Sequence, residues 1–261
     1  MASVDFKKLH SPAEMKRILR HCDKGRRLED GHRNKDINKE LTHKNTQLPN
    51  RDYSKVCELY RKRIAYLDKL EGANKRPDKV TCFALEIPAP NNMREKDKPE
   101  WFNKVYGLIC EQYDARNILQ FYVHYDEVHT YVHAETGQDK VSRVHAHCLV
   151  IPEHEGKLNG KWFSCRANMI KLNNDIQNMT LNDFALEFMD GSKKGSTKRV
   201  EQLKRESEAK AYEKYIREKE SEIAALDAVL EDKKVKAELH AEIWRLGVIE
   251  YNRIHGTNIE V

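Results

Sequence analysis

The chain has 261 residues, enough for one large domain or for a domain with an extension. Charged residues make up 34% of it, which indicates an extensive solvated surface, and the net charge of +5 permits a phosphate-bearing partner without requiring one. The six cysteines are widely spaced and form no Cys-x-x-Cys pair, which argues against a zinc ribbon and against a dense disulfide framework. No signal-peptide run and no membrane-spanning apolar stretch is evident, so we expect a cytoplasmic protein without a membrane span.

The first elements in chain order are helical. Residues 1–50 are polar and basic, with a short helix expected at Pro12 and Ser11 as its N-cap. Residues 53–70 carry apolar side chains at helical spacing and predict an amphipathic helix. Residues 80–88 are β-branched and aromatic and end in proline, which predicts a strand.

The middle of the chain alternates between helical and strand patterns. We expect a helix over residues 100–114, a long strand over 117–133, a turn at 135–139, a second strand over 141–152 and a helix over 168–190. This order predicts an α+β fold in which helices pack on a mostly antiparallel sheet.

A composition break at residues 191–198 predicts a linker between a domain over residues 1–190 and a charged helical extension over 199–261. Within the extension, apolar residues at seven-residue intervals up to Asp232 predict a long exposed helix and a weak coiled coil. A second, better patterned helix is expected from Glu238 to His255, packed on the core or on another subunit. We therefore expect self-association through these helices.

The pattern richest in chemistry is the pair His145 and His147, which alternate on a strand and so project from the same face. The preceding segment carries His124, Asp126, Glu127, His129 and His133. A plain hairpin centred on Gly137 would set Glu127 opposite His147 and His129 opposite His145. These four residues are therefore candidate ligands of manganese, zinc, nickel, cobalt or iron rather than calcium. Such an ion would polarise a phosphate oxygen.

Three segments resemble a known family. They are HRNKDINKELTHKNTQL (32–48), VHYDE…RVHAHCLVIPEHEGKLNGK (123–161) and GSKKGSTKRVEQLKRE (191–206). In this order they resemble the Mob/Pre (MobV-type) plasmid mobilisation relaxases and recombination enzymes of the HUH endonuclease superfamily. The resemblance covers roughly the first 210 residues.

The resemblance implies that His124, His145 and His147 bind a divalent metal, Mn²⁺ or Mg²⁺, with a catalytic Glu127 beside them. It also implies that His21 is the nucleophile. Some fifteen extra residues (128–143) interrupt the family motif, so His129 stays open as the third ligand in place of His124. We expect Asp126 to orient a histidine rather than to bind the metal itself.

The fold implied is an HUH relaxase-like antiparallel sheet with helices on one face. The implied reaction is site- and strand-specific DNA transesterification that leaves a 5′-phosphoryl adduct on the protein and a free 3′-OH. The implied partner is single-stranded or hairpin origin DNA. Two alternatives remain open: a non-cleaving DNA-binding protein on the same scaffold, and a structural zinc protein.

Basic residues near His21 are candidate phosphate contacts, which would make DNA binding salt-dependent. They are Lys24, Arg26, Arg27, Arg33 and Lys35, with Arg76 as a more distant candidate.

Overall fold

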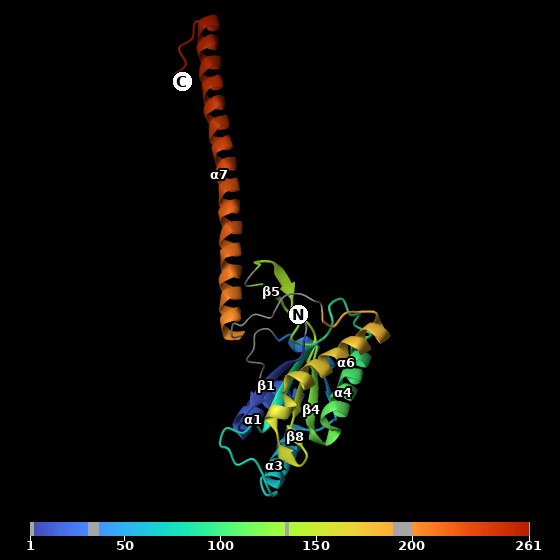
Figure 1. Cartoon of the computed structure of the whole chain (residues 1–261). Helices are drawn as coiled ribbons and strands as arrows, with labels where there is room; N and C mark the ends of the chain where they lie inside the picture. Colours follow the sequence, from blue (N-terminus) through green and yellow to red (C-terminus); the bar gives the residue numbers. More distant parts are fainter. Residues whose placement is uncertain (1–2, 31–36, 134–135, 190–199, 261) are drawn as a thin grey trace. The chain divides into compact units, whose positions relative to one another are not determined.

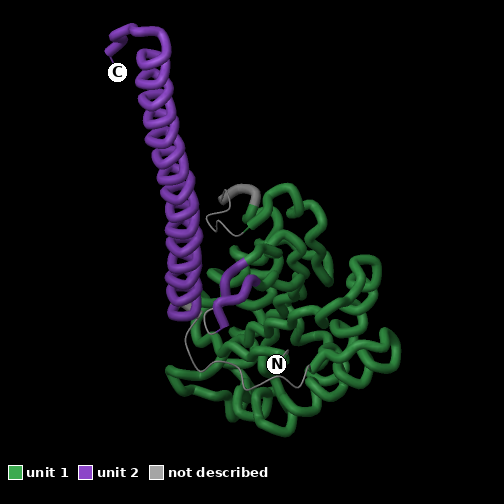
Figure 2. The backbone as a smooth tube through the Cα atoms, turned by 90° about the horizontal axis from the view of Figure 1, so that it is seen from above, with its two compact units in different colours: residues 1–130, 140–197 green, residues 131–139, 198–261 purple. Residues whose placement is uncertain are grey.

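The computed structural model describes residues 3–30, 37–133, 136–189 and 200–260 (Figure 1). The expected linker at 191–198, together with Arg33 and Lys35, lies outside the described residues. The chain forms two compact units, residues 1–130 with 140–197 and residues 131–139 with 198–261 (Figure 2). Each unit is described by itself below.

The first unit is built on a five-stranded antiparallel sheet in the order β1-β3-β7-β4-β2. Its strands are β1 (Asp5–Leu9), β2 (Thr46–Leu48), β3 (Cys82–Pro88), β4 (Ile118–His124) and β7 (His145–Val150). The central strand is β7, which carries the His-x-His pair. The expected α+β class and antiparallel sheet are confirmed.

Helices surround this sheet. They are α1 (Pro12–Cys22), α2 (Lys24–Asp30), α3 (Tyr53–Leu67), α4 (Lys98–Tyr113), α5 (Gly160–Phe163) and α6 (Arg166–Phe184), with 3₁₀ turns at Lys39–Lys44 (η1) and Ala115–Asn117 (η2). Two small two-stranded sheets pair β5 (Thr130–Val132) with β6 (Asp139–Val141), and β8 (Glu153–His154) with β9 (Lys157–Leu158).

Apolar side chains cover both faces of the main sheet, so the expectation of helices on one face was wrong. On one face Trp101 of α4 and Leu172 of α6 pack with Phe83 and Phe121. On the other face α1 and α3 pack over the sheet through Met15, Leu19, Val56, Tyr60 and Leu67. The amphipathic spacing of α1 and α3 creates this second layer because it gives each helix an apolar stripe to bury.

Helix α1 begins as its sequence predicts. The Ser11 hydroxyl accepts a hydrogen bond from the Glu14 amide at 3.2 Å, and Pro12 occupies the first turn. The helix ends at Cys22, and the Asp23 amide closes the last turn on the Leu19 carbonyl at 2.8 Å. Its buried side, which includes Leu19 and Cys22, fixes how the neighbouring His21 is turned.

The long strand expected over residues 117–133 is two strands. Strand β4 ends at His124, and β5 begins at Thr130 in a separate sheet. Residues 125–129 form a loop that is held by a hydrogen bond from the Tyr125 amide to the Asn45 side chain at 2.8 Å. The second expected strand, over residues 141–152, is also shorter than predicted, because β7 runs only from His145 to Val150 and Val141 belongs to β6.

The second unit contains α7 (Val200–His255), a single helix where two were expected. The segment between the two expected helices, residues 233–237, contains neither glycine nor proline, so nothing breaks the helix there. Near its start, the Ser207 hydroxyl donates to the Val132 carbonyl at 2.6 Å, and Lys214 pairs with Asp139 at 2.6 Å. No described helix is both long enough and apolar enough to cross a membrane.

Candidate metal and catalytic site

Three histidines meet where β4 and β7 lie side by side. His124 stands directly opposite His145, and Tyr122 stands opposite His147. The plain-hairpin register, which set Glu127 opposite His147, was therefore wrong, because β4 ends before Glu127 is reached. Alternation along β7 points His145 and His147 to the α1 side of the sheet, while Ala146 packs on the opposite side.

The rings of His124, His145 and His147 form a compact triangle. Their centroids are 5.4 Å apart for His124 and His145, 5.0 Å for His124 and His147, and 5.0 Å for His145 and His147. His124 is fully buried. The three imidazole rings therefore pack against one another where β7 begins.

Glu127 reaches into this triangle from the loop after β4. Its Oε1 lies 3.2 Å from His124 Nδ1, and its Oε2 lies 3.5 Å from His145 Nε2. One carboxylate thus contacts histidines from both central strands.

His21 faces the same carboxylate from the last turn of α1. Its Nε2 lies 3.2 Å from Glu127 Oε1, and its ring centroid is 5.5 Å from that of His124 and 5.6 Å from that of His147. The His21 side chain is 39% exposed, whereas that of His124 is fully buried. His21 is therefore the histidine of this group that an incoming molecule can approach.

Arg27 lies inside the site rather than on an exposed basic surface. Its side chain is 3% exposed, and it pairs with Asp126 at 2.7 Å and with Glu127. The Arg27 Nη2 atom that pairs with Glu127 also lies 3.1 Å from His124 Nδ1. Arg27 therefore neutralises two buried carboxylates and is not placed to contact DNA phosphates.

Asp126 is buried and holds this arrangement together. Its carboxylate accepts from Arg27 and, at 2.8 Å, from the Thr42 hydroxyl, while its backbone carbonyl accepts from the Asn38 amide at 2.7 Å. Arg27 links this carboxylate to the His124 ring, because its guanidinium contacts both side chains. The stretch around Thr42 belongs to the motif at residues 32–48, and its role in the site had not been predicted.

The electrostatics of the site favour neutral imidazoles at His124 and His147 beside an ionised carboxylate. At His145 burial opposes the charged form, but the hydrogen bond with Glu127 outweighs burial and raises the pKa. Burial lowers the pKa of His124 to about 4 and the pKa of His147 well below its usual value. Burial also lowers the pKa of His21, although Glu127 opposes this shift. Burial opposes the ionisation of Glu127, but hydrogen bonds with His124 and His145 outweigh it and hold the pKa of that carboxyl far below its usual range.

These donors fit a divalent transition metal. The Nε2 atoms of His124 and His147 are buried and have no hydrogen-bond partner among the described residues. Single donor atoms of His21, His124 and His147 lie within 4.8 Å of one another, as do those of His124, Glu127 and His145. Neutral imidazole with a carboxylate is the donor set that manganese, iron, cobalt and zinc accept.

The remaining predicted site residues lie elsewhere. His129 falls in neither group of donors, and its Nδ1 lies 3.2 Å from the Ser142 hydroxyl. Lys24 and Arg26 follow His21, with the Lys24 ammonium 3.1 Å from the His43 carbonyl and the Arg26 guanidinium over the Tyr53 ring at 4.7 Å. Arg76 pairs with Asp78 before β3 begins, whereas the histidines lie beside the end of β3.

Comparison with known proteins agrees with this geometry. A family profile described as "Plasmid recombination enzyme" (Mob_Pre) matches residues 1–207. A plasmid recombination enzyme of Streptococcus agalactiae is 28% identical over 184 residues, which cover 69% of this chain and 34% of that protein. A plasmid recombination enzyme of Bacillus sp. is 26% identical over 202 residues, which cover 74% of this chain and 45% of that protein. The matched region thus spans less than half of each relative.

Solved structures share the fold. The MobM relaxase domain (MOBV; Mob_Pre), Mn-bound and bound to plasmid pMV158 oriT DNA at pH 6.8, aligns with a TM-score of 0.61 and 23% identity over 77% of this chain and 96% of that one. The same domain at pH 4.6 aligns with a TM-score of 0.59 and 22% identity, covering 77% and 97% of the two chains. At this identity the likeness establishes the relaxase-type fold.

Proposed function

Since this chain belongs to the plasmid recombination enzyme (Mob/Pre) family, we propose that it is a metal-dependent relaxase that nicks and transfers one strand of plasmid DNA in the cytoplasm. The observation that carries the proposal is the position of His21, which faces the Glu127 carboxylate beside the triangle formed by His124, His145 and His147. The relatives' names and the Mn-bound, oriT-bound relaxase domains support it.

The proposed metal ligands are His124, His145 and His147. The two unpartnered Nε2 atoms support His124 and His147 as ligands, because a buried polar atom without a partner is costly unless a ligand satisfies it. His145 is included because the family resemblance implies it. When bound, Mn²⁺ or Mg²⁺ would neutralise the negative charge on the oxygens of the scissile phosphate. Arg27 and Asp126 would hold the carboxylate and the His124 ring in position for this ion.

His21 is the proposed nucleophile. Its contact with Glu127 keeps a proton on Nε2, so the lone pair lies on the other ring nitrogen, Nδ1. Attack forms a nitrogen–phosphorus bond and breaks the bond from phosphorus to the 3′ oxygen, which takes a proton from water. The ring gains positive charge in this step. Glu127 remains ionised and stabilises that charge, because its low pKa makes it a poor proton acceptor.

The proposed partner is single-stranded or hairpin origin DNA. Lys24 and Arg26 of α2 are the proposed phosphate contacts, and their closeness in the chain to His21 supports this proposal. We also propose that α7 mediates self-association, because apolar side chains such as Ile216, Ile223 and Leu230 are exposed along it.

Cleavage of DNA tests the proposal. A pool of supercoiled plasmids and single-stranded DNA, incubated with Mn²⁺, should yield open circles that EDTA prevents. His147→Ala should abolish nicking and leave hairpin DNA binding largely intact, and unchanged cleavage by this variant would contradict the metal assignment. Tight binding without cleavage under any metal would favour the non-cleaving alternative.

A further inference from the structure

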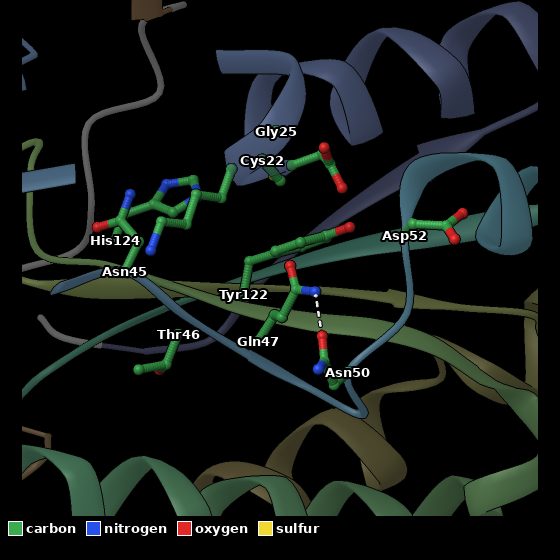
Figure 3. Close-up of a pocket in the computed structure, with 11 residues that line it drawn as sticks. Cys22, Gly25, Asn45, Thr46, Gln47, Asn50, Asp52, Tyr122 and His124 are labelled. Atoms are coloured by element: carbon green, nitrogen blue, oxygen red, sulfur yellow. Dashed lines mark hydrogen bonds between the residues drawn. The ribbon is translucent and has the colours of Figure 1, made fainter. Parts of the chain in front are cut away.

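A pocket of about 470 Å³ borders the site, and His124 is one of the residues that line it. Its other walls come from the turn between α1 and α2, from β2 and the segment after it, and from Tyr122 of β4. Figure 3 shows His124 and Asn45 at one end, Asn50 and Asp52 at the other, and Tyr122 and Gln47 between them. The volume lies in the range of roughly 300–1,000 Å³ that is usual for small-molecule sites.

A few hydrogen-bond acceptors stand among the mostly apolar walls of this pocket. The carboxylates of Asp23 and Asp52 both line it. Gln47 adds a carbonyl oxygen, because its amide nitrogen is directed away to Asn50 at 2.9 Å and to the Arg51 carbonyl at 3.1 Å. A ligand that offers N–H groups would therefore be held better than one that offers only oxygens.

Tyr122 lines the pocket with a buried phenol. Its side chain is 2% exposed, and the Asp23 carboxylate lies close to its hydroxyl. Burial and the neighbouring Asp23 carboxylate raise the pKa of this phenol, so it stays protonated. A protonated phenol at this position can donate a hydrogen bond either to Asp23 or to a ligand atom in the pocket.

The charge of the lining residues favours a nucleobase over a phosphate as the ligand of this pocket. The charged residues that line the pocket are two carboxylates, Asp23 and Asp52, and one ammonium, that of Lys24, which contacts the His43 carbonyl. This surplus of negative charge disfavours a phosphate inside the pocket, whereas an exocyclic amino group of a base would donate to a carboxylate.

We propose that this pocket binds one unpaired nucleobase that carries an exocyclic amino group, next to the phosphate held at the histidine site. The inference rests on the proposed function, because it requires single-stranded DNA to run past His124. Asp23 accepts from the amino group, and the Tyr122 hydroxyl donates to a ring nitrogen or carbonyl of the base. Unpaired bases are read on such edges in other single-strand binding proteins. The pocket would make cleavage depend on the base as well as on the phosphate.

The test compares oligo(dC) with oligo(dU) of equal length, because cytosine and uracil differ in the amino or carbonyl group that would face Asp23. Binding is measured by fluorescence anisotropy at fixed salt in EDTA, so it does not depend on metal or on cleavage. We expect the wild-type protein to bind oligo(dC) about tenfold more tightly, the scale of one well-placed base contact. Asp23→Asn should abolish the preference, because an amide also donates to the uracil carbonyl.

Asp23→Asn should not disturb the fold. Asp23 caps α2 by accepting from the Arg26 amide at 2.9 Å, and asparagine caps helices equally well. Two further variants complete the test. Tyr122→Phe removes only the hydroxyl and should weaken oligo(dC) binding roughly two- to tenfold. Asp78→Asn makes the same change in charge at an exposed position before β3 and should keep the preference.

Equal affinity of the wild-type protein for the two oligonucleotides, or a preference that survives in Asp23→Asn, would overturn the proposal. A protein that nicks DNA yet shows equal affinities would refute the base pocket alone. A protein that prefers oligo(dC) but never nicks would refute the cleavage reaction and leave the pocket standing. Binding of neither oligonucleotide would contradict both.

Discussion

His21 Nε2 lies 3.2 Å from Glu127 Oε1, so the exposed histidine at the end of α1 meets the same carboxylate that contacts His124 and His145. A single side chain thus links the proposed nucleophile to the proposed metal ligands. Whatever displaces Glu127 should therefore affect both the attacking ring and the histidine triangle.

Replacement of Glu127 by glutamine should slow cleavage strongly. The amide preserves the size of the side chain but removes the charge that stabilises the ring of His21 in the transition state. We expect the cleavage rate to fall about 10²–10³-fold, the range seen when one preorganised electrostatic group is lost. Single-turnover cleavage at saturating DNA measures this rate. Glu155→Gln, at an exposed position in the turn between β8 and β9, is the matched control, and a rate for Glu127→Gln equal to that control would contradict the role of the carboxylate.

Arg27→Leu should destabilise the fold itself. The variant leaves Asp126 and Glu127 buried without their cation, and breaking a buried pair in this way costs about 3–5 kcal/mol. Urea unfolding measures the change in free energy of unfolding. Arg116→Leu removes an exposed arginine paired with Asp114 and should change stability by about 1 kcal/mol or less. Similar losses in the two variants would mean that Arg27 is not buried as described.

Metal binding should stabilise the protein against heat. At free Mn²⁺ about a hundredfold above its Kd, binding to the folded state alone adds about 2.7 kcal/mol. For a chain of this size that corresponds to a rise in Tm of roughly 5–10 °C. The rise should vanish in His147→Ala and persist in His240→Ala, which alters an exposed histidine of α7. A persistent rise in His147→Ala would place the ion elsewhere.

The proposed metal ligands could be identified from the sequence because they belong to a local motif. Alternation on a strand places His145 and His147 on one face, and the family resemblance adds His124 and Glu127. The register could not be predicted, because nothing in residues 117–133 shows that the strand stops at His124. A plain hairpin predicts Glu127 as the cross-strand partner of His147, whereas the partner in the structure is Tyr122.

Arg27 shows a second limit of sequence reasoning. Arg27 lies in a run of basic residues. The local sequence does not show whether such an arginine is solvated or, as here, pairs with carboxylates about a hundred positions away. The same holds for the base pocket, whose walls come from three separate segments. Contacts of this kind depend on the packing of α1 and α2 over the sheet, which local spacing does not encode.

Truncation at Lys198 should reduce the mass of the protein in solution to that of a monomer. Helix α7 exposes apolar side chains at heptad spacing, Ile216, Ile223 and Leu230, which would be covered if two copies paired. Light scattering of the full chain and of the truncated chain measures the mass of each. As a control that keeps the whole helix, Ile223→Asp should weaken association as well. A full chain that is already monomeric would rule out this role for α7.

The most direct test of the central proposal is the covalent adduct itself. Wild-type protein and His21→Ala are incubated with Mn²⁺ and a pool of supercoiled plasmids, and the DNA is recovered under denaturing conditions. We predict open circles with protein attached at a 5′ end for the wild type, and neither open circles nor adduct for His21→Ala. An adduct formed by His21→Ala, or cleavage by the wild type that leaves no protein on the DNA, would contradict the histidine-nucleophile mechanism.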